Sequence, residues 1–127
     1  EDELLITADT IVYLDGEVLG KPSTSQDATD MLTKLSGKWH QVITGVALCT
    51  KAKRHSFAVT TQVKFADLTK DEIEHYVNHF SPLDKAGAYG IQEWIGYIGV
   101  ERIEGSYFNV VGLPVQRLYQ ELKQFVE

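Results

Sequence analysis

The sequence predicts one α/β domain in which a twisted sheet with mixed strand directions is flanked by helices. Extended runs rich in Val, Thr and Phe alternate with segments whose apolar residues recur at helical spacing. The chain has 127 residues, of which 43% are hydrophobic, and domains commonly contain about 100–200 residues. We therefore interpret residues 1–127 as a single domain.

The strands are predicted from apolar or alternating runs that turn residues separate. Residues 4–8 form an apolar run, and Asp15-Gly16 is typical of the turn of a β-hairpin. Two long runs rich in β-branched residues flank a polar connection at residues 51–54 and predict a second hairpin. The predicted strands are residues 4–8, 11–14, 17–19, 39–50, 55–65 and 95–104.

Three helices are predicted from capping residues and apolar stripes. Ser23 with Gln26 and Thr69 with Glu72 each resemble a capping box. Pro114 suits the first turn of a final helix. The predicted inward stripes are Ala28, Met31, Leu32 and Leu35, then Ile73, Tyr76, Val77 and Phe80, and finally Val115, Leu118, Tyr119 and Leu122.

The composition excludes several classes of function. The net charge of −6 argues against tight, sequence-independent binding to nucleic acid, which needs Lys and Arg to neutralise phosphates. No apolar run approaches the roughly 18 residues of a membrane span. The single cysteine, Cys49, excludes an internal disulfide and a cysteine-based zinc site. We therefore expect a cytoplasmic protein that binds neither nucleic acid nor membrane.

The segment from Asp84 to Gln92 carries the strongest functional signal. It combines an acid, a base, two glycines and an amide without any helix or strand period, and glycine lets backbone approach a ligand closely. An earlier segment has matching chemistry, since Asp9 follows an apolar run and Lys21 lies between Gly20 and Pro22. Two acid-plus-lysine segments in one small domain predict a site for a polyanion, such as a triphosphate, and a divalent metal.

Each of these residues also has a purely structural interpretation. We expect Asp9 at the carboxyl end of a strand, where it would bind a metal or accept a proton from water, or else accept hydrogen bonds from amides in a turn. Lys21 and Lys85 suit phosphate binding as point charges, or are solvated surface lysines. Asp84 fits metal coordination or an ordinary polar loop. Gln92 carries both a donor and an acceptor, which suits recognition of a base edge.

Other kinds of site find no support in the sequence. His75 and His79 lie four residues apart on a predicted helix, but no adjacent glutamate completes a metalloprotease pattern, so we expect a solvated helix face. No nucleophile elbow, P-loop or Rossmann glycine pattern occurs. Covalent catalysis and hydride transfer are therefore not predicted.

Taken together, these segments resemble the Maf family of nucleoside triphosphate pyrophosphatases, enzymes with an inosine-triphosphatase-like fold. The matching segments occur in order along nearly the whole chain. They are Ala8-Asp9-Thr10-Ile11-Val12, Leu19-Gly20-Lys21-Pro22, Leu35-Ser36-Gly37 with His40, Thr44-Gly45-Val46, Asp84 to Gln92, and Asn109-Val110-Val111-Gly112-Leu113-Pro114.

The resemblance implies a role for each site residue. Asp9 would be the general base or metal-linked acid that readies water for attack at the α-phosphorus. Lys21 and Lys85 would neutralise the polyphosphate. Asp84 would either help Asp9 to hold Mg²⁺ or Mn²⁺ or support its loop. Thr10 and Gln92 match positions associated with base selection. The segment from Asp84 to Gln92 looks like the branch that acts on dTTP and UTP, a housecleaning activity.

Two departures from the family pattern affect these expectations. The sequence Glu93-Trp94-Ile95 replaces the glycines that often follow Gln92, which would reshape one wall of the base pocket. The serine-proline-double-arginine segment that precedes the Asp9 strand in the family is absent, so we expect an N-terminally truncated Maf fold that hydrolyses nucleotides weakly or not at all on its own.

The resemblance also leaves alternatives open. They are a nucleotide-binding regulator of cell division with little catalysis, and a pyrophosphatase with another base choice such as 7-methyl-GTP. The family and the aromatic side chains of Trp94 and Tyr97 also suggest a homodimer.

Overall fold

A five-stranded sheet with the strand order β2-β1-β3-β4-β5 organises the molecule. The computed structural model describes residues 3–126. The strands are β1 (Leu5–Leu14), β2 (Glu17–Leu19), β3 (Trp39–Cys49), β4 (Arg54–Phe65) and β5 (Val100–Glu104). The helices are α1 (Ser25–Leu35), α2 (Lys70–Phe80), α3 (Trp94–Gly99), α4 (Tyr107–Val111) and α5 (Val115–Phe125), with 3₁₀ turns η1 (Pro82–Asp84) and η2 (Ala86–Ala88).

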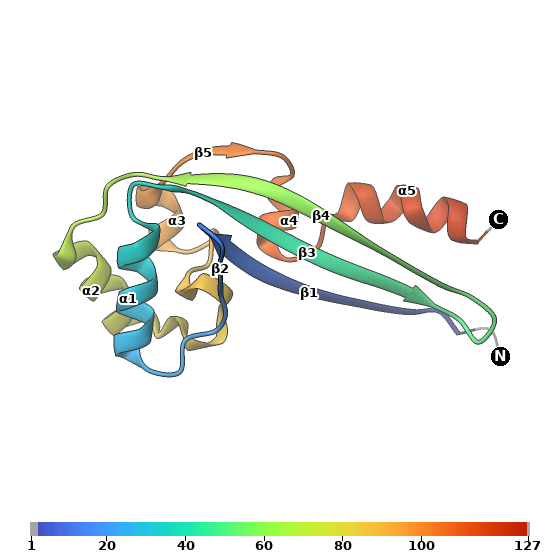
Figure 1. Ribbon diagram of the computed structural model, residues 1–127, viewed down its shortest axis with the longest axis horizontal. Coiled ribbons are helices and arrows are strands. Elements are labelled where there is room, and N and C mark those ends of the chain that lie inside the picture. The colour runs from blue at the N-terminus through green and yellow to red at the C-terminus, as the bar shows by residue number, and fades with distance from the viewer. Residues whose placement is uncertain (1–2, 127) are drawn as a thin grey trace.

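The three long strands extend well beyond the rest of the sheet and form an arm (Figure 1). β3 pairs with β1 from Leu5↔Cys49 to Tyr13↔Gln41 and with β4 from Cys49↔Arg54 to Trp39↔Lys64. Helices α1, α2 and α3 gather at one end of the sheet, whereas α5 lies along the arm (Figure 1). The molecule thus has a helical body and a narrow arm.

The predicted α/β fold, with a sheet flanked by helices, is confirmed, but the strand directions differ from the prediction. All four strand pairings among residues 3–126 are antiparallel. The reason lies in the connections. Two hairpins reverse the chain directly, and α1 returns it to the free side of β1, so that each strand meets a neighbour of opposite direction.

The main core lies between the sheet and the helices of the body. Its fully buried members include Leu32 and Leu35 of α1, Tyr76 of α2, Phe65 of β4 and Ile95 of α3. The predicted stripe of α1 is therefore confirmed, with Met31 partly buried against the same core. In α2 the stripe is confirmed except at Phe80, whose side chain is 40% exposed because it lies at the end of the helix.

The helix caps were predicted with one error. The capping box of Thr69 and Glu72 is confirmed, with both reciprocal hydrogen bonds present. At α1 the cap is Thr24, whose Oγ1 accepts from Asp27 N at 3.1 Å, rather than Ser23 with Gln26. Thr24 has the extended backbone that a cap requires, and Ser23 lies one residue too early.

The predicted strand over residues 95–104 was wrong in its first half. Residues 94–99 form α3, and only residues 100–104 form β5. The buried residues Ile95, Gly96 and Gly99 follow helical spacing. A Cβ on Gly96 would lie 2.0 Å from the Ile91 carbonyl oxygen, so this glycine lets α3 pack closely against the preceding turn.

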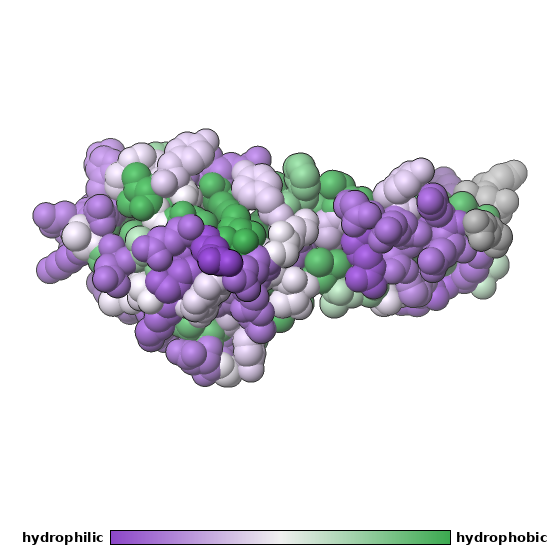
Figure 2. All heavy atoms as spheres, turned by 90° about the horizontal axis from the view of Figure 1, so that it is seen from above, coloured by the Kyte–Doolittle hydropathy of each residue, from purple (hydrophilic) through white to green (hydrophobic). Residues whose placement is uncertain are grey.

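Helix α5 covers the arm with a narrower stripe than predicted. Leu118 and Phe125 are buried and pack with Val46 and Leu48 of β3, and Leu122 is partly buried. Val115 and Tyr119 are 43% and 63% exposed, so their predicted inward position was wrong. The arm is only a few strands wide, and it cannot cover more than one side of the helix. Figure 2 shows the outer surface over α5 as largely hydrophilic.

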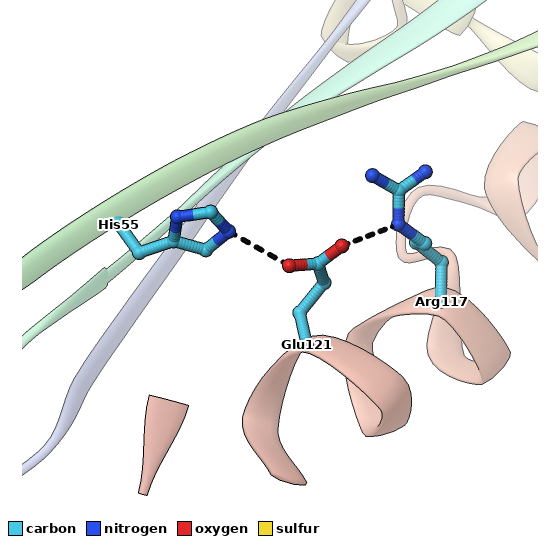
Figure 3. Close-up of polar contacts among 3 residues, drawn as sticks. All are labelled: His55, Arg117 and Glu121. Atoms are coloured by element: carbon cyan, nitrogen blue, oxygen red, sulfur yellow. Dashed lines mark hydrogen bonds and ion pairs between the residues drawn. The ribbon is translucent and has the colours of Figure 1, made fainter. Parts of the chain in front are cut away.

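A polar cluster also fastens α5 to the arm (Figure 3). Glu121 accepts hydrogen bonds from His55 Nε2 on β4 and from Arg117 Nε on its own helix, both at 2.7 Å. These contacts lower the pKa of the Glu121 carboxyl, with the Arg117 hydrogen bond as the largest cause.

Within residues 3–126 no helix combines the length and apolar character needed to cross a bilayer.

Candidate functional site

A cavity of about 350 Å³ opens where β1, the segment from residue 84 to residue 93 and the end of α4 meet. Three parts of the chain that are far apart in sequence therefore supply its walls. All six predicted site residues line it, and they are Asp9, Thr10, Lys21, Asp84, Lys85 and Gln92. The apolar part of the lining includes Val12, Val42, Tyr89, Ile91 and Val110.

Asp9 lies in the middle of β1, not at the carboxyl end of a strand as predicted. It pairs with Gly45 of β3, and the two predicted runs at residues 4–8 and 11–14 form one continuous strand through it. The strand continues because β3 offers partners along its full length. Asp9 is exposed and borders both the cavity and a shallower hollow of about 260 Å³ beside Gly45. Its carboxylate is therefore accessible to water and to a ligand.

Lys21 and Lys85 belong to two loops that a main-chain hydrogen bond joins. Gly87 N donates to Gly20 O at 3.0 Å. Gly87 has a φ of +68°, and a Cβ there would lie 2.8 Å from Val12 Cγ2. Only glycine satisfies both the backbone and the space at this position. The close contact of the loops with β1 brings both lysines to the same cavity.

The ammonium group of Lys85 lies between two carboxylates. Its Nζ is 3.5 Å from Asp84 Oδ2 and 3.9 Å from Glu93 Oε2. Asp84 is 77% exposed, whereas Lys85 and Glu93 are about one third exposed, at 30% and 29%. Lysine has three donor hydrogens, so an anion in the cavity can bind Lys85 without displacing both carboxylates.

A buried tyrosine supports this wall of the cavity. Tyr76 of α2 donates its hydroxyl hydrogen to Glu93 and accepts from Gly90 N at 3.2 Å. Burial, with the Glu93 hydrogen bond as a second cause, raises the pKa of Tyr76. The hydroxyl therefore stays a donor at neutral pH. Sequence reasoning missed this role, because the helical spacing of Tyr76 indicates only that it is buried.

A buried polar network holds α4 against the sheet, and the end of α4 lines the cavity. Asn109 Nδ2 donates to Val42 O at 3.1 Å and to Val59 O and Thr61 Oγ1 at 3.0 Å. Thr44 Oγ1 donates to Asn109 O at 3.3 Å. Asn109 is fully buried. The sequence marked this residue only as part of a family motif, without a structural role.

The network continues to the cavity through Thr10. Its Oγ1 lies 2.9 Å from Thr44 Oγ1 across the β1–β3 pair. Because Thr44 is itself fixed by α4, the hydroxyl of Thr10 has a defined position at the cavity wall. Such fixed polar groups suit orientation of a ligand rather than tight binding by themselves.

His40 lies behind the cavity and not in it. Its Nε2 lies 2.7 Å from the hydroxyl of Tyr89, which lines the cavity. Burial lowers the pKa of His40 to about 4. A neutral, buried imidazole that contacts one cavity residue supports the packing of Tyr89.

The oxygen ligands at the cavity are compatible with a divalent cation shared with a phosphate. Asp9, Asp84 and Glu93 supply hard carboxylate oxygens, and Mg²⁺ commonly uses one or two carboxylates together with substrate phosphates. No cluster of three or more metal-ligating side chains occurs within the described part of the chain. His75 and His79 contact each other on the surface of α2, and His75 also contacts Trp94. Neither histidine lines the cavity beside Asp9.

Comparison with known proteins places the chain in a family. The family described as Maf-like protein matches residues 1–125. The chain belongs to the Maf-like family. Its site residues therefore lie on a framework that other Maf-like proteins share.

Three Maf-like relatives show how close this relationship is. The proteins named "dTTP/UTP pyrophosphatase" from Phocaeicola vulgatus and Bacteroides fragilis are 64% and 63% identical to this chain over 123 residues. Each alignment covers 97% of this chain and 64% of the relative. The protein of the same name from Porphyromonas gingivalis is 52% identical over 127 residues, covering 100% of this chain and 64% of the relative. The chain thus spans about 64% of the length of the relatives it matches.

Proposed function

We propose that the whole protein is a nucleoside triphosphate pyrophosphatase that hydrolyses dTTP and UTP to the monophosphate and pyrophosphate. One observation supports this most directly: Asp9, Lys21 and Lys85, which are far apart in sequence, line a single cavity. The relatives named dTTP/UTP pyrophosphatase supply the choice of bases.

Lys21 and Lys85 bind the phosphate chain in this proposal. Each ammonium group neutralises negative charge as a point charge. The hydrogen bond between Gly87 and Gly20 fixes the two loops relative to each other, so the phosphates meet a preformed pair of cations. The reacting bond is thereby held in one position, which accounts for much of catalysis in phosphoryl transfer.

Thr10 and Gln92 bind the base. The amide of Gln92 can donate to one polar atom of a pyrimidine and accept from another. The hydroxyl of Thr10 is fixed by Thr44 at 2.9 Å. Apolar side chains such as Val42 and Val110 line the same cavity and provide a surface for the flat ring.

Asp9 activates the attacking water. Its exposed carboxylate accepts a proton from water as the water oxygen bonds to the α-phosphorus. The bond from that phosphorus to the bridging oxygen breaks, and pyrophosphate leaves with the bonding electrons. Asp9 and Asp84 would hold Mg²⁺ or Mn²⁺, which when bound neutralises charge on the phosphates.

Cytoplasmic location and a homodimer stay predictions. Of the two aromatic residues that suggested a homodimer, Tyr97 is 78% exposed, but Trp94 packs against His75 of the same chain.

Substitution of Asp9 tests the proposal. In the full-length protein, Asp9→Asn should reduce magnesium-dependent release of pyrophosphate from dTTP by about 10²–10⁴-fold, the usual contribution of a general base. The measurement is a pyrophosphate-release assay with a panel that includes dTTP, UTP and 7-methyl-GTP. Circular dichroism checks that the variant is folded.

The matched control is Asp15→Asn in the β1–β2 turn, outside the cavity. It should keep wild-type activity. Unchanged pyrophosphate release in Asp9→Asn would rule out the catalytic role of Asp9. Preferred hydrolysis of 7-methyl-GTP would overturn the choice of substrate.

A further inference from the structure

The hydroxyl of Tyr76 ties α2 to the wall of the cavity at two points. It accepts from the backbone N–H of Gly90 at 3.2 Å and donates to Glu93 Oε1. Tyr76 is fully buried, so its side chain is shielded from bulk water. The segment between Gly90 and Glu93 is thereby fixed to the core of the body.

The carboxylate of Glu93 is held on both sides. Its Oε1 accepts from Tyr76, while its Oε2 faces Lys85 Nζ at 3.9 Å. Its main chain is fixed as well, because Gly96 N donates to Glu93 O at 2.9 Å at the start of α3. Glu93 therefore offers Lys85 a negative charge at a defined place.

The stem of Lys85 is guided by a glycine. A Cβ on Gly90 would lie 2.9 Å from Lys85 Cε and 3.1 Å from Lys85 Cδ. The side chain thus passes over Gly90 and ends beside Glu93. Its other partner, Asp84, is 77% exposed and makes no further hydrogen bond among the described residues, so Glu93 is the better-fixed of the two carboxylates.

We propose that Glu93, held by Tyr76, is a positioning residue that sets the place of the Lys85 ammonium group for the phosphate chain. The proposal rests on the proposed pyrophosphatase function. The 3.9 Å distance is long for an ion pair, so Glu93 directs Lys85 without withdrawing it from the cavity. The sequence Glu93-Trp94-Ile95, which departs from the family pattern, then has a function in the phosphate site and not only in the base pocket.

A double-mutant cycle tests this proposal in the full-length protein. Glu93→Gln keeps an acceptor for Tyr76 but removes the charge. It should lower kcat/KM for dTTP about tenfold, mostly through kcat, since misplacement of a phosphate-binding group slows the reaction. In a Lys85→Met background the same substitution should change kcat/KM less than about twofold, because the group on which Glu93 acts is gone.

Two further variants separate positioning from general damage. Tyr76→Phe keeps the packing but frees Glu93, and it should reproduce the kcat loss of Glu93→Gln within about threefold. Glu101→Gln removes a comparable partner of Lys64, at 3.2 Å on the β4–β5 pair, and should leave kcat and KM unchanged. Equal losses from Glu93→Gln with and without Lys85, or no loss at all, would overturn the proposal.

A binding measurement distinguishes failure of this inference from failure of the proposed function. If the wild-type protein releases pyrophosphate from no nucleotide, the proposed function fails. The dissociation constant of inorganic triphosphate is then measured by calorimetry for the same variants of the double-mutant cycle. Weaker binding on Glu93→Gln, by about threefold and only where Lys85 is present, would still support the positioning role. Weakening in both backgrounds, no weakening in either, or no binding by the wild-type protein would overturn it.

Discussion

His40 is a buried ionisable side chain whose protonation opposes folding. It is 2% exposed, and its Nδ1 has no hydrogen-bond partner among the described residues. Burial lowers its pKa from 6.5 to about 4. Between these pH values the unfolded chain binds a proton that the folded chain does not bind. The contribution of His40 to stability is therefore complete above pH 6.5 and is lost as the pH falls toward 4.

This linkage gives a measurable pH dependence. From pH 7 to pH 4.5, His40 alone should lower the free energy of unfolding by about 2–3 kcal/mol. In His40→Gln that part of the pH dependence should disappear, whatever the stability of the variant at pH 7. Urea unfolding at both pH values measures the difference. His79→Gln, at an exposed position, serves as control, and an identical pH dependence in wild type and His40→Gln would contradict the assignment.

Sequence patterns identify which residues line the cavity, but they do not identify the contacts that hold those residues in place. Asp9 was predicted from its place after an apolar run, and Lys21, Lys85 and Gln92 were predicted because their charged or amide groups lie close to glycines. Tyr76 could not be predicted as a support, since its spacing in α2 shows only that it is buried. Its hydrogen bonds to residues 14 and 17 positions later depend on how α2 packs on the loop.

At the scale of elements, α5 belongs to a hydrophobic cluster that is separate from the main core. It packs on the arm through Leu118 and Phe125, and Glu121 links it to His55. Glu121→Gln removes the charge that both His55 and Arg117 contact. Amide hydrogen exchange in residues 115–125 should become faster, because local opening needs less free energy.

Mass spectrometry of exchanging peptides checks this prediction. Peptides from α1 and α2 should exchange as in the wild type, since these helices share the other core. A matched control is Glu74→Gln, which removes an exposed i,i+4 partner of Lys70. Faster exchange throughout the molecule would show that α5 unfolds with the body and not separately.

The hairpins and the three long helices were predictable because period, turn residues and caps agree within each segment. Helix α3 was not. It is only six residues long, and its glycines and aromatic residues show no strong period of either kind. Gly96 allows α3 to lie close to the carbonyl of Ile91, and this contact exists only after the preceding loop is in place.

At the scale of the whole molecule, ligand binding should stabilise the body and not the arm. The cavity is bounded by β1, the segment from residue 84 to residue 93 and α4, whereas α5 lies along the arm (Figure 1). Inorganic triphosphate at 100 times its dissociation constant should slow exchange in residues 84–93 by up to about 100-fold. Exchange in residues 115–125 should stay unchanged.

The same peptide-resolved exchange measurement checks this distribution. Inorganic sulfate at equal ionic strength is the control for general salt effects. Protection that appears at Lys53 to His55 and in α5, but not around residues 84–93, would place the anion on the arm and contradict the assigned site.

The main-chain hydrogen bond between Gly87 and Gly20 limits how this site can vary. It uses no side-chain atom, so exchanges at positions 21 and 85 can alter reach or charge while the frame that carries both positions persists. Insertion of a residue into either turn, in contrast, would shift one partner of that bond and misalign both cations at once. The backbone frame therefore tolerates replacement of the side chains at positions 21 and 85, but not a change in the length of either loop.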